Sequence, residues 1–186
     1  LRFTGSGVRK LPLNDLVICE SLVIDGPLLD NSIWDNRLIV KGSFARISGS
    51  FDAGDGDGAV IEFSGTSEQE IATSFTGNNA FHNMEINNPN GLILDGSVDV
   101  DNELVLTEGV IQTSETNILY LSNLSEDAVT GTDNNSYIDG PMEKQVISSG
   151  SFLFPVGDEN ILGPVEVMST LTSGSQRWRA WYHAAN

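Results

Sequence analysis

The sequence predicts an all-β fold, with a parallel β-helix or solenoid over residues 1–136 and an antiparallel β module over residues 137–186. Helical periodicity is absent over nearly the whole chain, while short triplets of the form apolar, any, apolar recur between clusters of Gly, Asn, Asp and Ser. One stretch carries a regular six-residue repeat. After about Ser136 the runs become longer and alternate, which is typical of antiparallel strands.

The six-residue repeat is clearest over residues 92–110. Leu92, Val98, Leu104 and Val110 are six residues apart, and the first three are each followed two places later by another aliphatic residue: Leu94, Val100 and Leu106. Residues two apart in a strand point to the same face, and the polar residues between triplets turn the chain. A repeat this short fits the faces of a coil that stacks on its neighbours and buries a column of aliphatic side chains.

Weaker copies of the pattern lie upstream, at residues 22–24, 28–29, 33–34 and 38–40, and continue at Phe44, Ile47 and Phe51. Trp34 is therefore expected in the core or cap of the solenoid, and Cys19, beside an apolar stretch, as a buried and unreactive side chain. The Asn-rich corners fit two interpretations: amide ladders between coils, or ordinary turn residues. The asparagines concerned are Asn78, Asn79, Asn83, Asn87, Asn88 and Asn90.

The predicted antiparallel module contains alternating runs at residues 137–141, 144–147, 151–157, 165–168 and 176–182. In the last run Trp178 and Tyr182 fall on one face and Trp181 on the other. One of these faces must be core, so at least part of this aromatic set is structural, and an exposed, coplanar pair of aromatic rings would favour glycan binding. Because Leu1 is neither an initiator Met nor part of a signal peptide, and strand-like residues reach His183, we expect a longer natural chain in both directions.

The charge balance excludes several partners. Nine Lys and Arg residues against 26 Asp and Glu give a formal net charge of −17. Nucleic acid is held through basic residues that neutralise phosphates, so we expect no nucleic-acid partner. An anionic bilayer surface would repel the chain in the same way, and its apolar runs are too short to cross a membrane, so we expect no membrane insertion.

The most suggestive polar cluster lies at residues 52–58, where Asp52, Asp55 and Asp57 alternate with glycines. Calcium prefers several oxygen ligands on a flexible loop, which makes these three carboxylates candidate calcium ligands. The second interpretation is a solvated turn, because Asp and Gly dominate turns in any case. Calcium is the one cofactor that the sequence suggests.

Catalytic motifs are not recognisable. His82 and His183 lie in no nucleophile motif, so we expect no enzymatic activity and assign no catalytic residues. The alternative is a glycan-binding or glycan-cleaving β-helix, because glycoside hydrolysis needs paired carboxylates. Its candidate carboxylate pairs are Asp99 with Asp101 on one strand face, and Asp55 with Asp57 if that segment is extended. A further candidate cluster within one coil comprises Asp35, Arg37, Lys41, Arg46 and Asp52. The simpler interpretation of these residues is a set of solvated surface charges.

The order of several individually weak motifs carries a family resemblance over residues 38–182. These motifs are residues 58–71, Phe81-His82-Asn83-Met84, the repeat at 91–111, Ile138-Asp139-Gly140-Pro141 and Phe154-Pro155-Val156-Gly157. Together they resemble the β-solenoid segments of large secreted, adhesin-like cell-surface proteins of Bacteroidota. The resemblance implies export by the type IX secretion pathway, an extracellular or cell-surface location, and a structural or adhesive role. The implied partners are a cell-surface glycan or other surface and secretion-machinery proteins.

Overall fold

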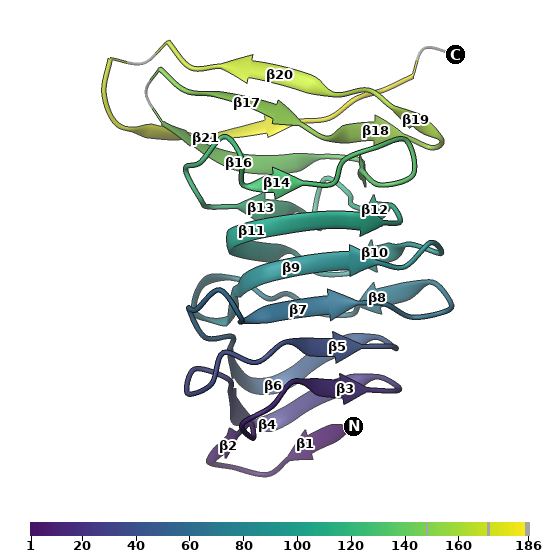
Figure 1. The fold of residues 1–186 in the computed structure, drawn as a ribbon, viewed down its shortest axis with the longest axis vertical. Helices are drawn as coiled ribbons and strands as arrows, with labels where there is room; N and C mark the ends of the chain where they lie inside the picture. Colours follow the sequence, from purple (N-terminus) through teal and green to yellow (C-terminus); the bar gives the residue numbers. More distant parts are fainter. Residues whose placement is uncertain (148, 171, 185–186) are drawn as a thin grey trace.

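A computed structural model describes residues 1–147, 149–170 and 172–184, and its architecture is all-β. About seven turns of a parallel β-solenoid are stacked along the long axis, and an antiparallel sheet lies at the end where the chain finishes (Figure 1). This confirms the predicted fold class. Among the described residues no helix is long and apolar enough to cross a membrane.

Two long sheets form the sides of the stack. The first sheet runs β1 (Arg2–Thr4), β4 (Leu22–Asp30), β6 (Phe44–Asp52), β8 (Gln69–Ile71), β10 (Leu92–Leu94), β12 (Ile111–Gln112), β15 (Ile138–Asp139), β18 (Val156–Asp158) and β19 (Ile161–Leu162), with β2 (Val8–Lys10) beside β4. The second runs β3 (Leu16–Ile18), β5 (Leu38–Val40), β7 (Val60–Phe63), β9 (Phe81–Asn87), β11 (Val98–Glu108), β13 (Leu119–Leu121), β16 (Met142–Ile147) and β21 (Ser175–Ala180), with β14 (Val129–Thr130) beside β11. A separate pair comprises β17 (Ser151–Phe154) and β20 (Val165–Met168), and η1 (Gly77–Asn79) is a single 3₁₀ turn.

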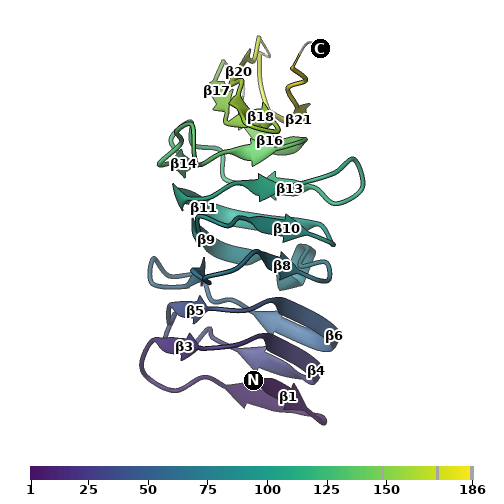
Figure 2. The same ribbon diagram turned by 90° about the vertical axis from the view of Figure 1, so that its right-hand side faces the viewer.

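Each coil contributes to both sheets, so paired strands of the solenoid come from successive coils (Figure 2). In the second sheet Leu16 pairs with Leu38, and Leu38 pairs with Ile61. Both pairings are parallel, and each is displaced along the chain by one whole coil. The same strand pairing is therefore repeated from coil to coil, and each coil is stabilised mainly by the coils above and below it.

The six-residue repeat corresponds to one coil divided into three segments. Its first triplet is β10, and the next two are the two halves of β11, which bends across a register shift. The chain then returns to the first sheet, where Ile111 pairs with Leu92. Val110, the fourth member of the repeat, is half-buried, and its neighbour Ile111 takes the core position.

Four phenylalanines form a cluster in the core of the N-terminal half. Phe44 and Phe51 come from β6, Phe75 from the segment between β8 and η1, and Phe81 from the start of β9, and all four are fully buried. The ring centroid of Phe44 lies 5.5 Å from that of Phe51, 4.5 Å from that of Phe75 and 5.8 Å from that of Phe81. In the first sheet β6 and β8 are joined by a single pair, Phe44 with Ile71. Aromatic packing therefore supplies cohesion where the strand ladder is thin.

An asparagine ladder links three coils at one corner. The Asn102 side-chain amide donates to Oδ1 of Asn83 at 2.8 Å, and that of Asn123 donates to Oδ1 of Asn102 at 3.1 Å. Lys144 Nζ, one coil further on, donates to the Asn123 carbonyl. The ladder interpretation is thus confirmed for Asn83. Asn88 makes a different cross-coil contact, to Gln69 Oε1 at 3.0 Å.

Parallel pairing continues beyond the predicted boundary at residue 136. β15 pairs with β12, β16 with β13, and β18 with β15, all in parallel. Among the named strands of the described residues, antiparallel pairing joins β16 with β21, β17 with β20, and β18 with β19. The change of pairing therefore lies later along the chain than the sequence predicted. Alternation alone does not reveal it, because a strand with one buried face alternates whether its neighbour is parallel or antiparallel.

Two predictions of burial are wrong. Cys19 is exposed in the turn that follows β3, although the preceding Ile18 is core. Trp34 is 50% exposed in the loop between β4 and β5. That loop leaves the stack, because Ser32 folds back onto the Asp30 carboxylate and Asp35 adopts a positive φ of 48°.

Candidate functional site

The predicted calcium loop joins β6 to β7, and it packs around Asp35 of the preceding coil. The Asp55 amide donates to Oδ1 of Asp35 at 3.1 Å. A Cβ added at Gly56 would lie 2.5 Å from Oδ2 of Asp35, and one at Gly58 would lie 2.6 Å from the Asp35 carbonyl oxygen. The glycines are therefore needed for this close approach, independently of any metal.

The three candidate ligands do not converge on one point. Asp52 is half-buried and accepts a hydrogen bond from the Gly54 amide at 3.1 Å, whereas Asp55 and Asp57 are exposed. Across residues 1–147, 149–170 and 172–184, no group of three His, Cys, Asp or Glu side chains is placed to hold a metal ion. Calcium binding by this loop stays a prediction, and it would require the loop to rearrange.

The predicted cluster of Asp35, Lys41, Arg46 and Asp52 is not assembled either. Lys41 Nζ donates to the Ser64 carbonyl and hydroxyl, both at 2.9 Å. Arg46 donates to the carbonyls of Gly49 and Ser74. Lys41 and Arg46 therefore form hydrogen bonds with nearby backbone carbonyls and a serine hydroxyl. They do not form a paired acid and base with the two aspartates.

Asp99 and Asp101 do lie on one outer face of β11, and other charged groups join them there. Along one row of the second sheet Asp99 is followed by Tyr120, Glu143 and Arg179 on successive strands. Both Arg177 and Arg179 donate to the Glu143 carboxylate. Burial raises the pKa of Asp99, an effect opposed by its hydrogen bond from the Gly77 amide and by the charge of Arg177.

The aromatic and polar groups of this face are also mutually paired. The Arg177 guanidinium lies 3.7 Å from the centroid of the Tyr120 ring, and the Tyr120 hydroxyl donates to Gln145 Oε1 at 2.9 Å. Asp101 accepts from the Ser122 hydroxyl at 3.0 Å. The polar and charged groups of this face therefore bond to one another, and these contacts join β21 to the solenoid. Glu143 was not among the residues predicted from the sequence, although Arg177 and Arg179, on either side of Trp178, indicate a charged face that needs an acidic partner.

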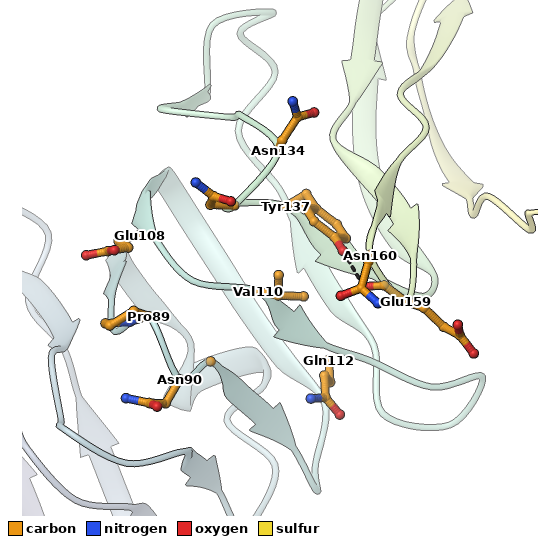
Figure 3. Close-up of a pocket in the computed structure, with 11 residues that line it drawn as sticks. Pro89, Asn90, Glu108, Val110, Gln112, Asn134, Tyr137, Glu159 and Asn160 are labelled. Atoms are coloured by element: carbon orange, nitrogen blue, oxygen red, sulfur yellow. Dashed lines mark hydrogen bonds between the residues drawn. The ribbon is translucent and has the colours of Figure 1, made fainter.

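A hollow of about 480 Å³ lies where the corners that lead into β10, β12 and β15 stack on one another (Figure 3). It arises because the corner at Gly109 is tight while the next corner, residues 131–137, is longer. A Cβ at Gly109 would collide with the Asn88 carbonyl, and its φ is 107°. The longer loop closes through an antiparallel bridge between Asp133 and Ser136 and overhangs the tight corner.

Side-chain amides dominate the walls of this polar hollow. Its lining contains five of them, Asn90, Gln112, Asn134, Asn135 and Asn160, and two carboxylates, Glu108 and Glu159. Tyr137 is only 1% exposed and donates its hydroxyl to the Glu159 carbonyl, shown as a dashed line in Figure 3. Such walls suit hydroxyl groups, but the aromatic ring in the lining, that of Tyr137, is too buried for a sugar ring to stack on it.

A second hollow of about 260 Å³ lies beside the end of β21. Its walls are Glu115, Gly140, Pro141, Arg179, Trp181 and His183. Trp178 and Tyr182 are partly buried and pack against the core, whereas Trp181 is 50% exposed. This agrees with the predicted division of the aromatics between two faces.

Comparison of the chain with protein-family models, with curated proteins and with solved structures found no match. Function is therefore inferred from the fold and from these surfaces.

Proposed function

We propose that the chain is a non-enzymatic structural or adhesive segment of a large exported bacterial surface protein. The observation that carries the proposal is the continuous parallel stack, in which strands of both sheets pair from coil to coil and one core runs through. A stack of this kind sets a distance between its two ends, and the number of coils sets that distance. The resemblance to secreted β-solenoid segments supports a type IX substrate on the cell surface or outside.

The pairing of surface charges supports a structural role. Arg37 bridges Glu62 at 2.8 Å and Glu85 at 2.6 Å across three successive coils, and Glu143 binds two arginines at the other end. These charged groups satisfy one another along the stack. The net charge of −17 would keep such rods soluble and apart.

The second candidate function is glycan binding, and the exposed Trp181 hollow is the observation that favours it. Indole presents both an apolar face and a polar edge, which suits a ligand with one apolar and one hydroxyl-rich side. Adhesion to a glycan is compatible with the structural role.

Incubation with bacterial and algal polysaccharides, in calcium and in chelator, tests the proposal. We expect no new reducing ends and no unsaturated sugar products with any polymer, because hydrogen bonds to backbone or hydroxyl groups already engage the candidate catalytic residues Lys41, Arg46, Asp99 and Asp101. Release of sugar ends would contradict the non-enzymatic assignment and favour a glycan-cleaving β-helix. Retention that requires calcium would direct attention to Asp52, Asp55 and Asp57.

A further inference from the structure

Trp181 is an exposed aromatic ring on a fixed support. Its neighbour Tyr182 packs its ring against Gly163, where an added Cβ would collide with it. The Ala184 amide donates to Oδ2 of Asp158 at 2.9 Å, which anchors the chain on the other side. The backbone that carries Trp181 is therefore anchored by its neighbours, which lowers the cost of ordering this segment when a ligand binds.

The polar groups around the indole are held too. Arg179 donates from Nε to Glu143 at 2.7 Å and pairs through Nη2 at 2.6 Å, which fixes the guanidinium plane. His183 lies across the hollow, with its ring centroid 6.3 Å from that of Trp181 and the two planes 77° apart. The exposed carboxylate of Glu115 completes the polar rim, while Pro141 adds an apolar wall.

We propose that this hollow binds one hexopyranose ring of a neutral glycan. The apolar face of a sugar ring would stack on Trp181, and its hydroxyl groups would bond Glu115, Arg179 and His183. Ligand pockets usually occupy about 300 to 1,000 Å³, so a hollow of about 260 Å³ is suited to a single ring.

The charges around the hollow favour a neutral ligand over an acidic one. Glu143 lies against Arg179 and offsets its charge, and Glu115 adds a carboxylate to the rim. The whole chain is strongly acidic, which repels uronic-acid polymers over a longer range. An acidic sugar would therefore lack an unpaired cation to bind.

This inference rests on the glycan-binding function proposed above and goes beyond the structural role, since a rod needs no ligand. Affinity electrophoresis in gels that contain dextran, galactomannan or xyloglucan tests it, with alginate and polygalacturonate as acidic probes. The wild-type chain is expected to be retarded by at least one neutral polymer and by neither acidic one. Trp181→Ala should weaken that retardation at least tenfold, and Glu115→Gln should weaken it severalfold.

Trp34→Ala is the matched control, because Trp34 has the same 50% exposure at the opposite end of the stack. It should migrate as the wild type does in every gel. Circular dichroism melting curves of the variants should coincide with that of the wild type, which separates loss of binding from loss of folding. Absence of retardation by all three neutral polymers, or equal retardation of wild type and Trp181→Ala, would overturn the proposal and leave the rod intact.

Discussion

Replacing Phe44 with alanine is expected to lower the free energy of unfolding by about 3–5 kcal/mol, the usual cost of deleting a buried phenylalanine ring. The ring of Phe44 is fully buried and contacts the rings of Phe51, Phe75 and Phe81. Its removal leaves a cavity where only one residue pair joins β6 to β8. The other three rings cannot close that cavity without breaking their own contacts. Urea unfolding followed by circular dichroism measures the loss.

Two further variants serve as controls for the stability loss expected of Phe44→Ala. Phe44→Leu keeps part of the volume and should cost less than the alanine variant. Trp34→Ala removes a half-exposed ring outside the stack and should cost well under half as much. A loss below about 1 kcal/mol for Phe44→Ala, smaller than any typical phenylalanine truncation in a core, would contradict the packing described here.

Lys144 is expected to make stability rise with pH in the alkaline range. Its side chain is 1% exposed, Nζ lies 5.0 Å from the centroid of the Phe152 ring, and burial lowers the pKa of Lys144 from 10.5 to about 8. Below pH 8 the lysine is charged in both states, and its burial reduces stability. Between pH 8 and 10.5 the native state has lost the proton while the unfolded state keeps it, so the free energy of unfolding increases with pH.

The size of this effect follows from the shift. One pKa unit corresponds to about 1.4 kcal/mol, so the contribution of Lys144 should change by about 3 kcal/mol in total. The readout is the difference in unfolding free energy between wild type and Lys144→Met at pH values from 7 to 10.5, because other titrating groups cancel in that difference. The free energy of unfolding of Lys144→Met should exceed that of the wild type by a margin that shrinks steadily as the pH rises through 8. A difference independent of pH would show that Lys144 is not charged and buried as described.

The fold class was predictable from the sequence because each short triplet contains, within a few residues, the pattern of a solenoid strand. Each triplet places two aliphatic side chains on one face, and Leu92, Val98 and Leu104 mark three segments of a single coil. The phenylalanine cluster was not predictable in the same way. Phe44, Phe51, Phe75 and Phe81 follow no common spacing, and they meet only because coils of unequal length fold back on one another.

The candidate sites depended even more on contacts between coils. The glycines of residues 54–58 suggested a metal loop, but they are explained by Asp35, which lies about one coil earlier in the chain. Lys144 looks like an ordinary strand residue, and only the packing of Phe152 and the Asn123 carbonyl against it shows that it is buried. The division of Trp178, Trp181 and Tyr182 between two faces was predictable, because it depends only on strand alternation.

Removing one whole coil tests the central claim that stacked coils set the length of a rod. Deletion of residues 22–43 takes out β4 and β5 and brings β1 next to β6 and β3 next to β7, in the register that the present pairs define. Spin labels on the exposed Cys19 and on Asn134→Cys, a free side chain on the same edge of the stack, report the distance along it. We expect a folded protein in which the distance between the two spin labels is shorter by about 4.8 Å, one strand spacing. A deletion variant that does not fold, or one whose label separation stays the same, would contradict it.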